Sequence, residues 1–173
     1  TEMFGDIAPD SDAASPPGAY RGGDYREKRD LEQVNLVLGF PSFSYHDDDF
    51  YAAAVFTSLF GGGMSSRLFQ EIREKRGLVY SIYSFVSSYS DSGLFGIYAG
   101  TGEEETQELI PLVCDEIKKI CDSVDDDELS RARAQIKASI LMGLESSSSR
   151  CEQLARQMMV FGRPLPTEEV VAN

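Results

Sequence analysis

The sequence has very little histidine, and this shortage excludes two kinds of catalytic site. His46 is the only histidine in 173 residues, whereas a zinc hydrolase site uses several histidine or carboxylate ligands. Neither His-Glu-x-x-His nor its inverse occurs. A serine nucleophile would also lack a histidine to take its proton. We therefore expect no metal site and no catalytic residue in this chain, and interpret His46 as a solvated residue before a helix.

Basic residues and long apolar runs are also scarce. The 16 Lys and Arg residues against 29 Asp and Glu give a net charge of -13, which repels nucleic acid and anionic membranes. The longest apolar runs, such as 51–56, are far too short for a membrane span. The acidic runs 103–105 and 125–127 are expected to begin helices rather than to attract a cationic ligand.

The three cysteines are an odd number and do not suggest a disulfide framework. Cys114 and Cys121 lie on one predicted helix, about 10 Å apart in rise, which is too far for a disulfide bond. We expect free thiols that serve as small buried apolar side chains, in a reducing compartment.

What the sequence does contain is the composition and patterning of one globular domain behind a linker. Residues 1–24 hold proline and glycine among Asp, Ser and Ala, and lack the basic and apolar composition of a targeting leader. We interpret residues 1–18 as a linker from a missing upstream domain and 19–173 as a single domain. No internal repeat is evident.

The hydrophobic pattern predicts strands first and helices later. Strands are expected over 20–29 and 31–40, helices over 47–61 and 65–77, a hairpin over 78–101 with its turn at 90–93, and helices through 109–121, 125–144 and 147–161. Asp125 with Glu128 predicts a capping box, and Gly77 the left-handed end of a helix. This order indicates an α+β two-layer sandwich, a mainly antiparallel sheet covered on one face by helices.

The segment 61–80 is the most informative for function. Its helix and following strand bring Tyr80 back beside Arg73, and a guanidinium with a phenol can clamp a carbonyl or a developing oxyanion. From spacing alone, an ion pair of Arg73 with Glu71 or Glu74 and a purely structural Tyr80 are favoured. The glycines at 61–63 lack the Gly-Lys-Ser/Thr ending of a phosphate loop, so an interhelical hinge is the simplest interpretation.

Four tracts also carry a specific resemblance to a known family. Residues 31–33, 61–69, 73–81 and 91–100 resemble, in order and spacing, the pitrilysin and mitochondrial processing peptidase family of zinc metallopeptidases. The resemblance extends over roughly residues 15–170. It places the chain not in the zinc-binding domain of that family but in its C-terminal, non-zinc-binding domain, which faces the zinc site across a clamshell that encloses peptides.

The resemblance implies roles for several residues. Arg73 and Tyr80 fit the spacing of a pair that holds the substrate backbone and stabilises the tetrahedral intermediate, and Gly61, Gly62 and Gly63 form a candidate substrate loop. Zinc is implied in the parent protein, on another domain or subunit. The chain alone is then inactive, and the parent cleaves extended peptides or presequences.

Several expectations follow for the parent protein. It is expected to form a homo- or heterodimer, to bind peptide substrates and to have no nucleic-acid partner and no membrane span. Free thiols and family habit favour an intracellular location, in the bacterial cytoplasm, with the mitochondrial matrix as the alternative. A catalytically inactive partner or scaffold subunit of the same family is the alternative function.

Overall fold

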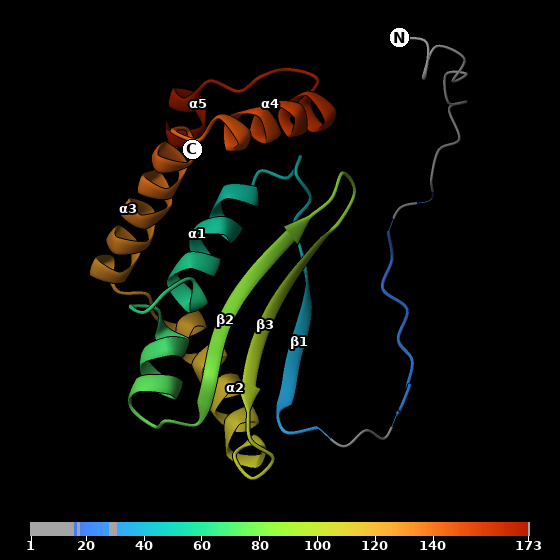
Figure 1. Cartoon of the computed structure of the whole chain (residues 1–173), viewed down its shortest axis with the longest axis vertical. Helices are drawn as coiled ribbons and strands as arrows, with labels where there is room; N and C mark the ends of the chain where they lie inside the picture. Colours follow the sequence, from blue (N-terminus) through green and yellow to red (C-terminus); the bar gives the residue numbers. More distant parts are fainter. Residues whose placement is uncertain (1–15, 17, 28–30, 173) are drawn as a thin grey trace.

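The chain folds as one three-stranded antiparallel sheet with helices against one of its faces, which confirms the predicted α+β two-layer sandwich (Figure 1). The computed structural model describes residues 16, 18–27 and 31–172. The elements are β1 (Val34–Ser42), α1 (Phe50–Gly61), the π-helix η1 (Phe69–Glu74), β2 (Val79–Ser88), β3 (Gly93–Thr101), α2 (Thr106–Asp122), α3 (Asp126–Gly143), α4 (Ser147–Phe161) and α5 (Thr167–Ala172).

The sheet has the strand order β1-β3-β2, so the hairpin strand β3 lies in the middle. The predicted hairpin is confirmed, and its turn is closed by the Tyr89 amide, which donates to the Ser92 carbonyl at 2.8 Å. β1 pairs along its whole length with β3, from Val34 opposite Thr101 to Ser42 opposite Gly93. Because β1 is an edge strand of this sheet, Pro41 is tolerated within it.

The predicted strand over 20–29 is wrong for the part that the structure describes. Residues 20–27 form no strand, and 28 and 29 lie outside the described residues. The segment carries two adjacent glycines and several charges, a composition that strands disfavour, and Tyr20 and Tyr25 stay 91% and 87% exposed. Of the predicted linker 1–18, only residues 16 and 18 are described, and the Gly18 amide donates to Asp91 Oδ2 at 2.6 Å.

The first two helices begin without a side-chain capping hydrogen bond. Asp49 stands at the N-cap of α1, but its side chain makes no capping hydrogen bond and the acidic residues 47–49 precede the first turn. Ser66 does not cap the next helix, because its hydroxyl donates backwards to the Gly63 carbonyl at 2.6 Å. The predicted end of α1 at Gly61 and the left-handed Gly77 (φ 68°) are confirmed.

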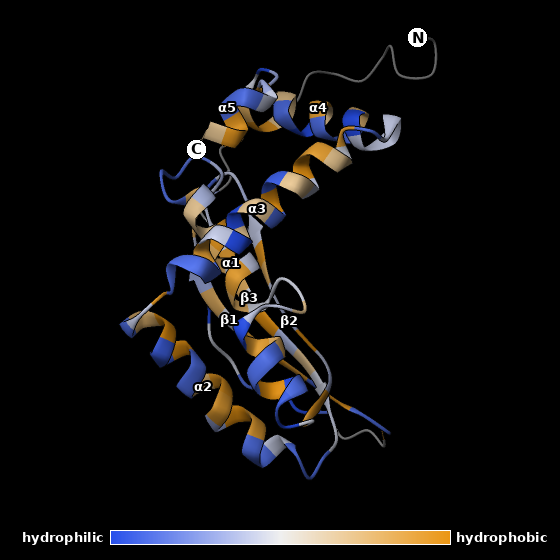
Figure 2. Cartoon of the chain, turned by 90° about the vertical axis from the view of Figure 1, so that its left-hand side faces the viewer, coloured by the Kyte–Doolittle hydropathy of each residue, from blue (hydrophilic) through white to orange (hydrophobic). Residues whose placement is uncertain are grey.

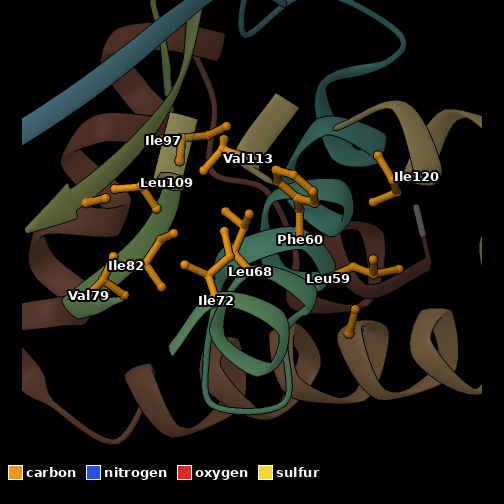
Figure 3. Close-up of a cluster of buried hydrophobic side chains, with 12 residues drawn as sticks. Leu59, Phe60, Leu68, Ile72, Val79, Ile82, Ile97, Leu109, Val113 and Ile120 are labelled. Atoms are coloured by element: carbon orange, nitrogen blue, oxygen red, sulfur yellow. The ribbon is translucent and has the colours of Figure 1, made fainter. Parts of the chain in front are cut away.

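The hydrophobic core lies between the inner face of the sheet and the helices (Figures 2 and 3). The strands contribute alternate side chains to this core, and α1, η1 and α2 each contribute the apolar residues of one side. Phe60, Leu68 and Ile72 have no exposed surface. Ile72 therefore holds η1 against the core, although other residues of this helix, such as Arg73, are exposed to solvent. The buried apolar residues are Leu59, Phe60, Leu68, Ile72, Val79, Ile82, Ile97, Ala99, Leu109, Val113, Ile120 and Ala132.

The C-terminal helices follow the prediction, with one addition. The capping box of α3 is present: the Asp125 side chain accepts from the Asp127 amide, and Glu128 accepts from the Asp125 amide. Pro111 lies inside α2 without delaying its start at Thr106. The short helix α5 was not predicted. No helix within the described residues is long and apolar enough to cross a membrane.

The cysteine prediction was right about pairing and wrong about burial. Cys114, Cys121 and Cys151 are free, as expected, but all are exposed rather than buried. The two on α2 lie off the apolar stripe of that helix, whose buried members are Leu109, Val113 and Ile120.

Candidate functional site

The turn after η1 ties the end of that helix to the start of β2. Gly77 adopts a left-handed conformation, its amide donates to the Arg73 carbonyl at 3.0 Å, and the Leu78 amide donates to the Ile72 carbonyl at 3.3 Å. The Thr101 hydroxyl on β3 donates to the Leu78 carbonyl at 2.6 Å. Backbone hydrogen bonds therefore fix the position of Arg73 relative to the first residues of β2.

Tyr80 occupies an irregular position of the sheet. Val79 pairs with Thr101 and Ser81 pairs with Gly100, so Tyr80 has no partner of its own on β3. An extra residue of this kind is a β-bulge, which bends the strand and changes the direction of a side chain. The Tyr80 side chain is 68% exposed, whereas Val79 is buried in the core.

Arg73 is exposed and carries no ion pair among the described residues. Its guanidinium lies over the Phe69 ring, with Cζ 4.8 Å from the ring centroid. Lys75 and Arg76 both pair with Glu71, and the hydrogen bond from Lys75 is the main cause that lowers the pKa of Glu71 below its usual value. The alternative in which Glu71 binds Arg73 is therefore not observed.

Arg73 near the end of η1 and Tyr80 near the start of β2 flank the same turn, and both residues are exposed. Within the described residues, no hydrogen bond joins the two side chains, so both retain donors for a third group. Guanidinium N–H groups and a phenolic O–H can donate to a carbonyl oxygen or to an oxyanion. We refer to these two residues as the Arg73–Tyr80 corner.

The glycine tract packs against the protein at one end and is more exposed at the other. Gly61 is buried, and a Cβ there would lie 2.4 Å from the backbone nitrogen of Ser84 on β2. Gly62 is exposed and its carbonyl accepts from Gln135 Nε2 of α3 at 3.0 Å. A Cβ on Gly63 would meet only the Gln135 side chain, at 3.1 Å. A Cβ on Gly62 would lie 2.5 Å from the Cα atom of Ser58, so Gly61 and Gly62 both have a packing reason that Gly63 lacks.

An ion pair that sequence reasoning missed holds this tract and η1 in place. Arg67 donates through Nε and Nη2 to both carboxylate oxygens of Glu128, the Nη2 contact being 2.6 Å, and also donates to the Ser123 carbonyl at 2.8 Å. The two side chains are only 14% and 22% exposed. The capping-box prediction had identified Glu128, but nothing in the spacing pointed to a partner 61 residues away.

We expect this ion pair to contribute to stability in a pH-dependent way. The Arg67 hydrogen bonds hold the pKa of Glu128 below its usual range, so the contribution is present above the unfolded-state pKa of about 4.3 and is lost as the pH falls through the lower, folded-state pKa. Glu128→Gln should lower the free energy of unfolding by about 1–3 kcal/mol at neutral pH. The difference from wild type should shrink toward pH ~3.

Urea unfolding followed by circular dichroism at a series of pH values measures this. Asp115→Asn is the matched control, because the Lys118–Asp115 pair is 76% and 56% exposed and should change stability by less than about 0.5 kcal/mol. A Glu128→Gln effect that is no larger than that of the control would contradict the assignment.

The part of the chain that the structure describes offers no ligand set for a zinc ion. Among the described residues, no group of three His, Cys, Asp or Glu side chains comes together to hold a metal. His46 instead packs edge-on against Phe161, with ring centroids 5.8 Å apart.

Fold and site together define a two-layer α+β domain with an exposed polar corner and no metal-holding group in its described part. Comparison with known proteins agrees with this class. The chain belongs to the family of the peptidase M16 inactive domain, whose model matches residues 1–136.

Named relatives and solved structures support the same assignment. A relative from Rickettsia felis, named as an uncharacterized zinc protease, is 40% identical over 90% of this chain, and one so named from Bacillus subtilis is 35% identical over 83%. The chain spans only 38% and 36% of their lengths. A peptidase M16 inactive domain from Pseudomonas fluorescens superposes with a TM-score of 0.67 at 26% identity, covering 81% of this chain and 37% of that one.

A further solved structure has a similar fold but lower sequence identity. A chain of the complex III dimer from Candida albicans matches with a TM-score of 0.73, covering 82% of this chain and 36% of that chain. At 20% identity this likeness concerns the fold only.

Proposed function

We propose that this chain is the substrate-clamping C-terminal domain of a zinc metalloendopeptidase that cleaves extended peptides or presequences. Zinc and its ligands belong to another domain or subunit of the same protein. Family membership and relatives named as zinc proteases support the reaction class. Those relatives include bacterial proteins from Rickettsia felis and Bacillus subtilis, which favours a bacterial setting over the mitochondrial alternative.

The observation that carries the proposal is the Arg73–Tyr80 corner. An exposed arginine without an ion pair in the described structure and a tyrosine on a β-bulge contribute little to the core. A π-helical turn is rare, and such turns often occur at functional sites, as do β-bulges. Both irregularities lie in the segment that links Arg73 to Tyr80.

In the proposed reaction, the corner acts on the peptide and not on the metal. Arg73 and Tyr80 donate hydrogen bonds to the backbone carbonyl of the substrate. These bonds strengthen as negative charge develops on the carbonyl oxygen during attack by water, which is how an oxyanion hole lowers a barrier. Because Phe69 covers one face of the Arg73 guanidinium, the N–H groups at its rim stay available.

Tyr80→Phe tests the role of the phenol. The full-length protein with zinc and an extended basic peptide should lose about 10²-fold in kcat when the hydroxyl is removed. The phenyl ring remains, and Tyr80 is 68% exposed, so stability should stay within about 0.5 kcal/mol of wild type. Turnover is measured by liquid chromatography of the cleaved peptide, and unfolding by circular dichroism.

Tyr25→Phe is the matched control, because Tyr25 is 87% exposed in the segment before β1. Unchanged kcat in Tyr80→Phe would remove the phenol from the mechanism. A wild-type protein that cleaves no peptide, alone or with its natural partner, would instead favour the catalytically inactive partner or scaffold subunit.

A further inference from the structure

The outer face of the sheet, opposite the helices, is left uncovered by every helix of the described structure (Figure 1). Directly opposed residues of an antiparallel pair lie on the same face, and the residues that alternate with the core side chains form this outer face. In a chain of net charge -13, none of them is charged. The outer-face residues are Asn35, Val37, Gly39, Pro41, Ser81, Tyr83, Phe85, Ser87, Leu94, Gly96, Tyr98 and Gly100.

Three of these side chains form one continuous row across the sheet. Tyr83 on β2 and Val37 on β1 both pair with Tyr98 on β3. The rings of Tyr83 and Tyr98 stack with centroids 4.9 Å apart at an interplanar angle of 28°. Tyr83 is 46% and Val37 59% exposed, so the row offers ring and methyl surface to a ligand. We call these three residues the aromatic row.

Neighbouring residues fix the shape of the aromatic row. The Tyr98 hydroxyl donates to Asn35 Oδ1 at 2.7 Å, which holds that ring. On the other side, the Phe85 ring lies over Gly96, where a Cβ would come within 2.2 Å of Phe85 Cζ. The Phe85 ring therefore lies close to the sheet beside the stacked pair, with its centroid 6.2 Å from that of Tyr83 and its plane tilted by 53°.

One member of the aromatic row, Tyr83, lies on β2, the same strand as Tyr80. At about 3.3 Å of rise per residue, Tyr83 is about 10 Å along β2 from Tyr80, the length of roughly three residues of an extended peptide. A peptide held by its backbone at Tyr80 can therefore reach the row with a side chain a few residues from the clamped carbonyl. The absence of charge on the outer face makes an uncharged, apolar side chain the one that fits.

We propose that the aromatic row is a subsite for an apolar or aromatic side chain of the extended peptide substrate, with Tyr83 as its main contact. This inference rests on the proposed function, because it takes the occupant to be the clamped peptide. An aromatic pair contributes about 0.5–1.5 kcal/mol beyond its buried area. The row should therefore favour phenylalanine over alanine at the matching peptide position about 2- to 12-fold.

The test measures binding by the full-length protein of labelled peptides with an uncleavable central bond. One series moves a single phenylalanine along an otherwise identical alanine-containing peptide, and fluorescence anisotropy gives each Kd. Wild type should prefer phenylalanine at one position about 2- to 12-fold. Tyr83→Ala should abolish this preference, raising the Kd of the preferred phenylalanine peptide more than that of the all-alanine peptide. Tyr83→Phe should keep it, since the ring and not the hydroxyl makes the contact.

Tyr25→Ala controls for loss of an exposed tyrosine, and thermal unfolding of Tyr83→Ala controls for folding. A preference that survives in Tyr83→Ala overturns the proposal. An equal loss of affinity for the phenylalanine-containing and all-alanine peptides in Tyr83→Ala also overturns it, as does a change in the mass of this variant measured by sedimentation. Each of these results would mean that the outer face contacts another part of the protein or a second copy. If Arg73→Ala leaves turnover unchanged while Tyr83→Ala still abolishes the preference, the clamp fails and the subsite stands; the reverse result rejects only the subsite.

Discussion

Arg73→Ala should lower kcat of the full-length protein on an extended peptide by about 10²–10³-fold, the cost of removing one preorganised oxyanion donor. The loss should fall mainly on kcat, because the guanidinium binds the charge that develops during the reaction more strongly than the neutral carbonyl. Arg73→Lys should recover only part of the rate, since an ammonium group lacks the planar fork of donors. Steady-state kinetics on a single peptide measures all three proteins.

Arg76→Ala is the matched control for this experiment. Arg76 lies three residues further along and has the same charge, but it is bound to the Glu71 carboxylate and carbonyl. Its removal changes the net charge as Arg73→Ala does, so a purely long-range electrostatic effect on a basic peptide would appear in both variants. Equal kinetic changes in the two would contradict a local role for Arg73.

Gly61→Ala should be more destabilising than Gly63→Ala, by about 1–3 kcal/mol or more. A Cβ at Gly61 would lie 2.4 Å from the backbone nitrogen of Ser84, and that strand cannot move aside without disturbing the hydrogen bond from the Ser84 hydroxyl to the Thr57 carbonyl. Gly63→Ala should cost less than about 1 kcal/mol, because only the flexible end of Gln135 must shift. Urea unfolding of both variants gives the comparison.

Activity measurements on the same two variants separate the two interpretations of the glycine tract. If the tract is a hinge between α1 and η1, activity should follow stability, and Gly63→Ala should be close to wild type. If the tract is a substrate loop, Gly63→Ala should lower kcat/KM while the protein remains as stable as wild type. A large kinetic loss in the stable variant would thus reject the hinge.

Much of the fold could be predicted because local patterns and burial agree. The hairpin was readable from its alternating residues and from the turn residues at 90–93, and the capping box of α3 from Asp125 and Glu128 alone. The strand predicted over 20–29 failed because two adjacent glycines and several charges in this segment disfavour a strand.

The candidate site was predicted only as far as sequence spacing reaches. The sequence showed the spacing of Arg73 and Tyr80. It did not show the competition for Glu71, because that depends on where the helix and the following turn place Lys75 and Arg76 relative to the Glu71 carboxylate. The ion pair of Arg67 with Glu128 depends on how α3 packs against α1 and the segment that follows α1, which no local pattern encodes. The aromatic row was hidden for the same reason, since strand register decides which side chains meet.

The π-turn of η1 and the bulge at Tyr80 make residues 69–80 a segment that is not optimised for thermostability. Each is a departure from regular backbone geometry, yet the side chains that end the segment, Arg73 and Tyr80, are solvated and return little packing energy. Selection for heat tolerance alone would therefore tend to remove the extra residue of the π-turn and the extra residue of the bulge, which would make the helix and the strand regular. A consensus or thermostabilised version of this domain is best designed with residues 69–80 held unchanged.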